Sequence, residues 1–199
     1  MASVAGLLVI IRFATKLYVA KVPLGLDDWF VLIAMVSSIP SAFINVYGLA
    51  ANGLGRDIWT LKPDAITEVL MYFHVMACLY FLDTTLVKLS MICFYQRIFP
   101  SPAAQRLLWG TFALTGVWGA LFMLIAVFQC RPIHYFWTRW DGLHEGSCLD
   151  ANAIAWSNAA TNIALDAWIL VIPLWHLRAL QLHRMKKIGV GLMFCVGTL

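Results

Sequence analysis

The most constraining feature of this sequence is a long apolar run, residues 68–99, that carries two charged side chains, Asp83 and Lys88, well inside it. The run is longer than the roughly 20 apolar residues with which a helix crosses a bilayer. At the centre of a membrane helix each charge costs on the order of 3 kcal/mol, so charged side chains at that depth face protein. We therefore predict that this run is the central helix of a membrane bundle whose other helices supply polar partners.

The composition supports a membrane environment. Hydrophobic residues make up 62% of the chain and charged residues 12%, whereas charged residues are about 25% of a typical soluble protein. Long apolar runs are separated by short charged loops, a pattern typical of membrane spans. The sequence therefore predicts an all-α fold, a polytopic transmembrane helix bundle.

Four apolar runs have the length of complete spans, and they lie at about 29–51, 68–98, 107–130 and 151–177. Two shorter runs, residues 1–20 and 188–199, are expected to be partial spans. The first would be the end of a helix that begins upstream, and the second the start of a helix that continues downstream. Residues 1–199 would then form one partial membrane domain.

The distribution of lysine and arginine predicts the orientation. If successive loops alternate sides, nine of these residues fall on one side and four on the other, with Lys88 left inside the bilayer. Because basic residues are retained in the cytoplasm, the side with nine is cytoplasmic. We therefore expect a multi-pass protein, placed in the plasma membrane, with the 130–150 loop extracellular.

A polar stripe runs along the last complete span. Asn158, Asn162 and Asp166 are four residues apart and, at 100° per residue, occupy one arc of about 80°. Polar groups inside the membrane face the bundle interior. The stripe is therefore either a set of interhelical hydrogen bonds or the wall of a ligand pocket.

Lys88 and Asp166 are expected at the same depth. Each lies about ten residues from the cytoplasmic end of its span, which is about 15 Å at 1.5 Å per residue. We therefore predict an ion pair between them, and we place Asp83 deeper, level with Asn45 and Asn162. The candidate ligand pocket or intramembrane polar network consists of Asn45, Asp83, Lys88, Asn158, Asn162 and Asp166.

Two cysteines, Cys130 and Cys148, enclose a loop that is rich in aromatic residues. A disulfide between them would constrain the loop by about 3 kcal/mol in the chain-entropy model. Such a bond persists only on the oxidising side of the membrane, which agrees with the orientation above. A bond from either cysteine to Cys78 is the alternative, and it requires Cys78 to lie near the membrane surface.

Two carboxylates, Asp27 and Asp28, directly precede the first complete span. At a helix N-terminus they would interact with free amides and with the positive end of the helix dipole. The functional alternative is cytoplasmic coupling, together with Arg97 and Arg178. The simpler explanation for these two arginines is retention of positive charge on the cytoplasmic side.

The sequence contains no signature of catalysis. It has no nucleophile elbow and no phosphate-binding loop, so we expect no enzymatic activity and no catalytic residues. His134, His144 and Glu145 match no metal-site spacing, so no metal is predicted. The expected partner is the lipid bilayer, and no nucleic acid partner is indicated.

Several short motifs together resemble one family. They are GLDDW at 25–29, GLGR at 53–56, KLS at 88–90, FYQRIF at 94–99, CRP at 130–132 with Cys148, and Asn162 with Asp166 ahead of Ile172 and Pro173. In this order they resemble the fungal rhodopsin-domain family of seven-helix integral membrane proteins, which includes receptor-like members implicated in surface sensing. The resemblance implies that the chain runs from the end of helix one to the start of helix six.

By this resemblance the expected function is a G-protein-coupled-receptor-like sensor of an extracellular ligand, with a heterotrimeric G protein as a partner. The alternatives are an ion- or proton-coupled transporter, with Asp83, Lys88 and Asp166 as its relay, and a truncated inactive fragment. Rhodopsins hold retinal on a lysine of their final helix. Because this chain does not include that helix, we expect no such cofactor.

Overall fold

The computed structural model describes residues 25–50, 61–179 and single positions at 6, 9, 11, 15, 55 and 57. Its elements are α2 (Leu26–Phe43), η2 (Ile44–Ala50), α3 (Pro63–Ile98), α4 (Pro102–Val127), β1 (Cys130–Arg131), α5 (Tyr135–Thr138), η4 (Arg139–Asp141), β2 (Ser147–Cys148) and α6 (Ala151–Ala179). Within these residues, four helical segments are long and apolar enough to cross a membrane. The all-α membrane-bundle prediction is therefore confirmed. The expected partial span at 188–199 lies outside the described residues, and the one at 1–20 is described at four positions only.

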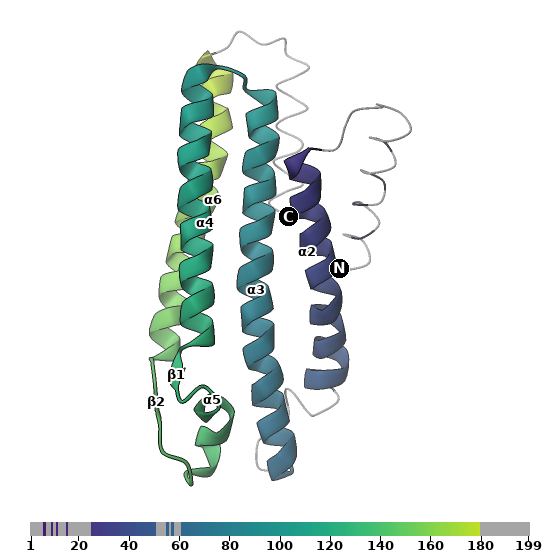
Figure 1. The fold of residues 1–199 in the computed structure, drawn as a ribbon, viewed down its shortest axis with the longest axis vertical. Coiled ribbons are helices and arrows are strands. Elements are labelled where there is room, and N and C mark those ends of the chain that lie inside the picture. The colour runs from purple at the N-terminus through teal and green to yellow at the C-terminus, as the bar shows by residue number, and fades with distance from the viewer. Residues whose placement is uncertain are drawn as a thin grey trace.

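Helix α3 is the centre of the bundle, as the sequence predicts. It packs against α2 on one side and against α4 on the other, while α6 packs on α4 and also touches α3 (Figure 1). The short elements β1, α5 and β2 lie together at the end of the bundle opposite the start of α4 (Figure 1). Two different faces of α3 are therefore covered by protein, and polar side chains on either face can contact a neighbouring helix.

Prolines mark the starts of α3 and α4. Pro63 and Pro102 each occupy the first turn, where a missing backbone N–H leaves no hydrogen bond unmade. Ser101 precedes α4 as its N-cap and accepts a hydrogen bond from the amide of Ala104 at 3.3 Å. Both helices thus begin five residues before the predicted spans at 68 and 107, because their first turns are helical without being apolar.

The first long helix changes geometry in its second half. Pro40 in α2 has no N–H to donate, and from Ile44 to Ala50 the chain forms a π-helix with wider turns. There Gly48 approaches α3 so closely that a β-carbon would lie 2.9 Å from the ring of Tyr72. The wider turn rotates the side chains around Gly48 relative to their positions in a continuous α-helix.

Two buried apolar clusters hold α3, α4 and α6 together. One consists of Ile92, Tyr95, Phe99, Ala104, Leu108, Ile169 and Ile172. The other consists of Phe81, Trp118, Phe122, Ala126 and Leu165. The chain between residues 81 and 92 of α3, which carries Lys88, therefore lies between two packed regions.

Candidate functional site

Lys88 on α3 forms an ion pair with Asp166 on α6, as the depth argument predicts. The lysine is 4% exposed, whereas the Asp166 side chain is 52% exposed. A buried ammonium needs a partner, because an uncompensated charge in a protein interior is strongly destabilising. The pair joins two helices that are 78 residues apart in sequence and sets how closely α6 approaches α3 at this level.

Two tryptophans align α4 with α6 on either side of this pair. Trp168 donates its indole N–H to Thr111 at 3.2 Å, and Trp118 donates to Thr161 at 2.9 Å. Because α4 and α6 are antiparallel, the residues between Thr111 and Trp118 lie level with those between Thr161 and Trp168. The stretch of α4 around residue 115 is therefore level with Asp166.

Thr115 is completely buried at this level. Among the described residues, its hydroxyl oxygen has no hydrogen-bond partner. The side-chain carbonyl oxygens of Asn158 and Asn162 are likewise buried with no partner in the described part of the chain. We call Lys88, Thr115, Asn158, Asn162 and Asp166 the polar centre; three of its members hold buried oxygens that remain able to accept hydrogen bonds.

The predicted stripe on α6 therefore faces inward at Asn158 and Asn162 and reaches the edge of the bundle at Asp166. Asn158 is 8% exposed and Asn162 is half-buried, in contrast to Asp166. Leu165 and Ile169, on the same face of α6, are buried against α3 and α4. The polar centre thus extends from the bundle interior to an exposed carboxylate.

Asp83 belongs to a separate contact on the α2 side of α3. It is half-buried and accepts a hydrogen bond from the hydroxyl of Ser37 on α2. Asn45, which the sequence analysis places level with Asp83, is exposed within the π-helical segment η2. The wide turns that follow Pro40 change the direction of side chains there relative to a continuous α-helix.

The acidic residues at the start of α2 are buried. Asp27 is 3% and Asp28 1% exposed, and Asp28 accepts a hydrogen bond from the amide of Gly25 at 3.1 Å. Ser90 on α3 donates to the carbonyl oxygen of Asp27 at 2.9 Å. Both residues are therefore enclosed where α2 begins beside α3, and a part for them in cytoplasmic coupling stays a prediction.

The two arginines assigned to coupling are placed differently. Arg97 is exposed in the last turn of α3. Its guanidinium lies near the start of α2, 3.7 Å from where a β-carbon on Gly25 would be. Arg178 is in the last turn of α6, and its side chain lies outside the described residues.

A disulfide joins Cys130 to Cys148, which confirms the predicted bond. The two cysteines face each other in the antiparallel pair of β1 and β2, and Arg131 faces Ser147. Cys78 carries a free thiol, so the alternative pairing with it is wrong. The disulfide closes the aromatic loop at its base, directly beyond the end of α4.

Aromatic residues hold this loop against the neighbouring end of α3. Trp140 donates its indole N–H to Thr67 at 3.0 Å. The ring of Phe136 lies 5.0 Å from that of His74, which is also within hydrogen-bonding distance, 3.2 Å, of the Gln129 amide nitrogen. The loop therefore covers the end of the bundle toward which Asn158 of the polar centre lies.

The loop histidines do not gather with other metal-binding groups. His144 contacts the carboxylate of Asp141 at 3.0 Å. The amide of Leu143 and, secondarily, His144 hold the pKa of the Asp141 carboxyl below its usual value. Across the described residues, no three His, Cys, Asp or Glu side chains form a group that could hold a metal ion.

The model of the fungal rhodopsin domain matches residues 11–199, which is nearly the whole chain. The chain belongs to the fungal rhodopsin domain family. This result confirms the resemblance drawn from the short motifs. No solved structure matches the chain.

Among curated relatives, this fungal rhodopsin domain is 30% identical over 121 residues to "Satratoxin biosynthesis SC1 cluster protein 4" of Stachybotrys chartarum, covering 60% of the chain and 44% of that relative. It is 26% identical over 181 residues to "Wortmanamides biosynthesis cluster protein C" of Talaromyces wortmannii, covering 87% and 48%. It is also 26% identical over 151 residues to "SAT4 family membrane protein" of Emericella nidulans, covering 73% and 38%. The chain therefore spans less than half the length of each of these relatives.

Some members of the site were missed by sequence reasoning. Thr115 and the Trp118–Thr161 and Trp168–Thr111 hydrogen bonds were not predicted, although Thr111, Thr115 and Trp118 recur at helical spacing. That spacing is a detectable signal for one face of α4 in this fungal rhodopsin domain. It does not reveal which of these hydroxyls would find a partner, because that depends on the register of α6.

Proposed function

We propose that this fungal rhodopsin domain is a receptor-like sensor whose ligand acts at the polar centre between α3, α4 and α6. The observation that carries the proposal is the Lys88–Asp166 ion pair together with three buried oxygens that find no partner in the described part of the chain, those of Thr115, Asn158 and Asn162. Each such oxygen costs about 1–3 kcal/mol when left without a donor. A ligand that donates hydrogen bonds to these oxygens would remove this cost, and the free energy recovered would favour binding.

The ion pair supplies the element that a ligand can shift. Lys88 is buried and fixed on the central helix, while Asp166 is half exposed on the neighbouring helix. A ligand changes such an equilibrium only if it binds the two arrangements with different affinity. In this proposal the ligand binds best when Asp166 moves away from Lys88, which shifts α6 relative to α3.

A heterotrimeric G protein on the cytoplasmic side would bind differently when α6 shifts relative to α3. We place this side at the Arg97 end of α3, because nine lysines and arginines lie on that side of the bilayer and four on the other. The disulfide loop then faces the exterior of the plasma membrane, where its bond persists. Arg97 and Arg178 are the proposed contacts, and no catalytic step or cofactor is part of the proposal.

The names of the relatives suggest a class of ligand. Two of them are named for the biosynthesis clusters of satratoxin and of wortmanamides. We extend this to propose that the external cue is a small biosynthetic product carrying hydrogen-bond donors. The buried acceptor oxygens at the polar centre are the chemical match for such donors.

The test is nucleotide exchange by a fungal heterotrimeric G protein in membranes that contain the full-length protein. Asp166→Asn weakens the ion pair without changing side-chain volume, so it should raise ligand-independent exchange several-fold. Adding Arg97→Ala to this variant should return exchange to the background level. Asp64→Asn, which removes an exposed carboxylate from the first turn of the same central helix, should leave exchange at the wild-type level.

Two other results would oppose the sensor. Proton-coupled uptake by liposomes containing the protein, abolished by Asp166→Asn, would support a transporter. Unchanged exchange in Asp166→Asn, with the protein folded and in the membrane, would show that the ion pair controls no G-protein response.

A further inference from the structure

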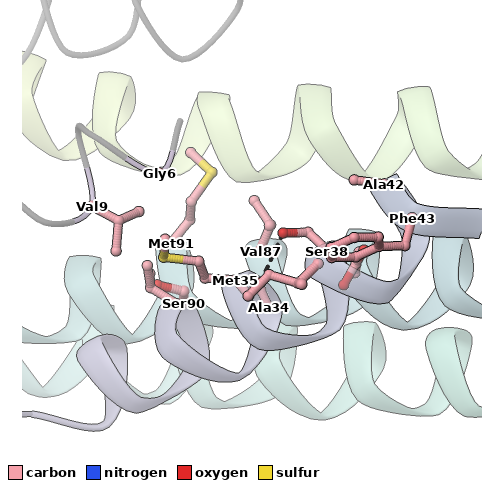
Figure 2. Close-up of a pocket in the computed structure, with 13 residues that line it drawn as sticks. Gly6, Val9, Ala34, Met35, Ser38, Ala42, Phe43, Val87, Ser90 and Met91 are labelled. Atoms are coloured by element: carbon pink, nitrogen blue, oxygen red, sulfur yellow. Dashed lines mark hydrogen bonds between the residues drawn. The ribbon is translucent and has the colours of Figure 1, made fainter. Parts of the chain in front are cut away.

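A cavity lies between α2 and α3, on a different face of α3 from the polar centre. Its volume is about 530 Å³, within the 300–1,000 Å³ typical of small-molecule sites. Figure 2 shows side chains of both helices around it, with Gly6 and Val9 beside them. The apolar part of its wall includes Val31, Ala34, Met35, Ala42, Val87 and Met91.

One carboxylate lines this otherwise apolar cavity. Asp83 accepts a hydrogen bond from Ser37 at one oxygen, and in the described part of the chain no lysine, arginine or histidine lies within ion-pair distance of it. The other polar side chains of the wall are already engaged. Ser38 donates to the carbonyl of Met35 at 2.8 Å, and Ser90 donates to the carbonyl of Asp27 at 2.9 Å.

A carboxyl group that faces an apolar cavity in the membrane can form an ion pair with a bound cation. The attraction between opposite charges is stronger there than in water, because the surroundings are less polar. A neutral alcohol or an anion gains no such attraction. The apolar wall selects for a hydrocarbon group attached to that cation.

We propose that this cavity binds a free amphiphilic amine, with its ammonium on Asp83 and its alkyl part along the apolar wall. Asp83 lies near the middle of α3, about 22 Å from its cytoplasmic end at 1.5 Å per residue. The headgroup of a bilayer lipid stays at the membrane surface, so depth favours a free amine over an amino lipid. This site shares no residue with the polar centre and does not depend on the proposed sensor function.

The test measures binding of decylamine to the purified full-length protein in a neutral detergent, with decanol as the uncharged comparison. Decylamine should raise the melting temperature, since a ligand that binds only the folded state stabilises it. Asp83→Asn should weaken decylamine binding about tenfold or more, the usual effect of losing a charged hydrogen bond. Asp64→Asn should leave binding unchanged, because Asp64 does not line the cavity.

A second variant keeps the carboxylate and removes the space. Ala42→Phe adds a ring at an exposed position of α2 that lines the cavity, and it should abolish decylamine binding while the protein stays folded. Equal binding of decylamine and decanol, unaffected by Asp83→Asn, would show that the cavity is only an apolar crevice. A rise in melting temperature with phosphatidylethanolamine vesicles, but none with free decylamine, would assign the site to an amino lipid. Neither result would affect the nucleotide-exchange test of the polar centre.

Discussion

The buried ammonium of Lys88 on α3 is paired with the half-exposed carboxylate of Asp166 on α6. Removing either side chain leaves the other charge unpaired at the depth of the membrane core, where each charge costs on the order of 3 kcal/mol. The pairing leads to the first prediction.

Asp166→Ala and Lys88→Ala should each destabilise the protein, because each leaves an unpaired charge within the membrane-spanning part of the bundle. Breaking a buried ion pair by removing one partner costs about 3–5 kcal/mol. Thermal or denaturant unfolding of the full-length protein in detergent measures both losses. The double exchange of Lys88→Asp with Asp166→Lys should recover part of the loss, and strictly additive effects of the single changes would contradict the pairing.

Gly119→Ala should weaken the packing of α4 on α3. A β-carbon on Gly119 would collide with the side chain of Thr85, whereas one on Gly116 would meet nothing within 4 Å. Overpacking of this kind costs about 1–3 kcal/mol. Unfolding measurements should show the loss for Gly119→Ala and none for Gly116→Ala.

Thr85→Ala provides the matching test, because it removes the two Thr85 atoms nearest to Gly119. Combined with Gly119→Ala, it should restore part of the lost stability. If the double variant lost as much unfolding free energy as the two single variants together, the contact between Gly119 and Thr85 would not be the cause of the destabilisation.

Trp118→Phe should cost about 0.5–1.5 kcal/mol by removing the indole N–H that bonds to Thr161. The aromatic ring would still fill its place against Phe122. Trp156→Phe is the control, since Trp156 is 78% exposed. In a double-mutant cycle with Thr161→Val, the changes in unfolding free energy should be non-additive. Strictly additive changes would show that this hydrogen bond does not link α4 to α6.

Replacing both Cys130 and Cys148 by serine should lower the stability of the loop region by about 3 kcal/mol in the chain-entropy model. The same loss should follow from treating the wild-type protein with a reducing agent. Cys78→Ser should leave the response to the reducing agent unchanged, because Cys78 carries a free thiol. Hydrogen exchange of the backbone amides of residues 130–148 measures the stability of the loop. Equal protection of these amides with and without the disulfide would contradict the prediction.

The depth of the charged residues was predictable from the sequence because helices translate residue number into height at a constant rise. That rule placed Lys88 level with Asp166 and correctly paired them. It does not give the direction of a side chain, and Asn45, which lies in the π-helical turns after Pro40, is exposed. It also says nothing about burial, so it did not predict that Asp27 and Asp28 are enclosed.

The sequence by itself determined the membrane class and the long helices, and it predicted the Lys88–Asp166 pair and the disulfide between Cys130 and Cys148, for which the structure excluded the alternative with Cys78. These features depend on local composition, on spacing along one helix or on the cost of a charge in lipid. Only the tertiary structure decided that Thr115 has no hydrogen-bond partner among the described residues, that Asp83 turns to Ser37 and that a cavity lies beside it. These features depend on the rotation and register of one helix against another, which many side chains set together and no short stretch of sequence encodes.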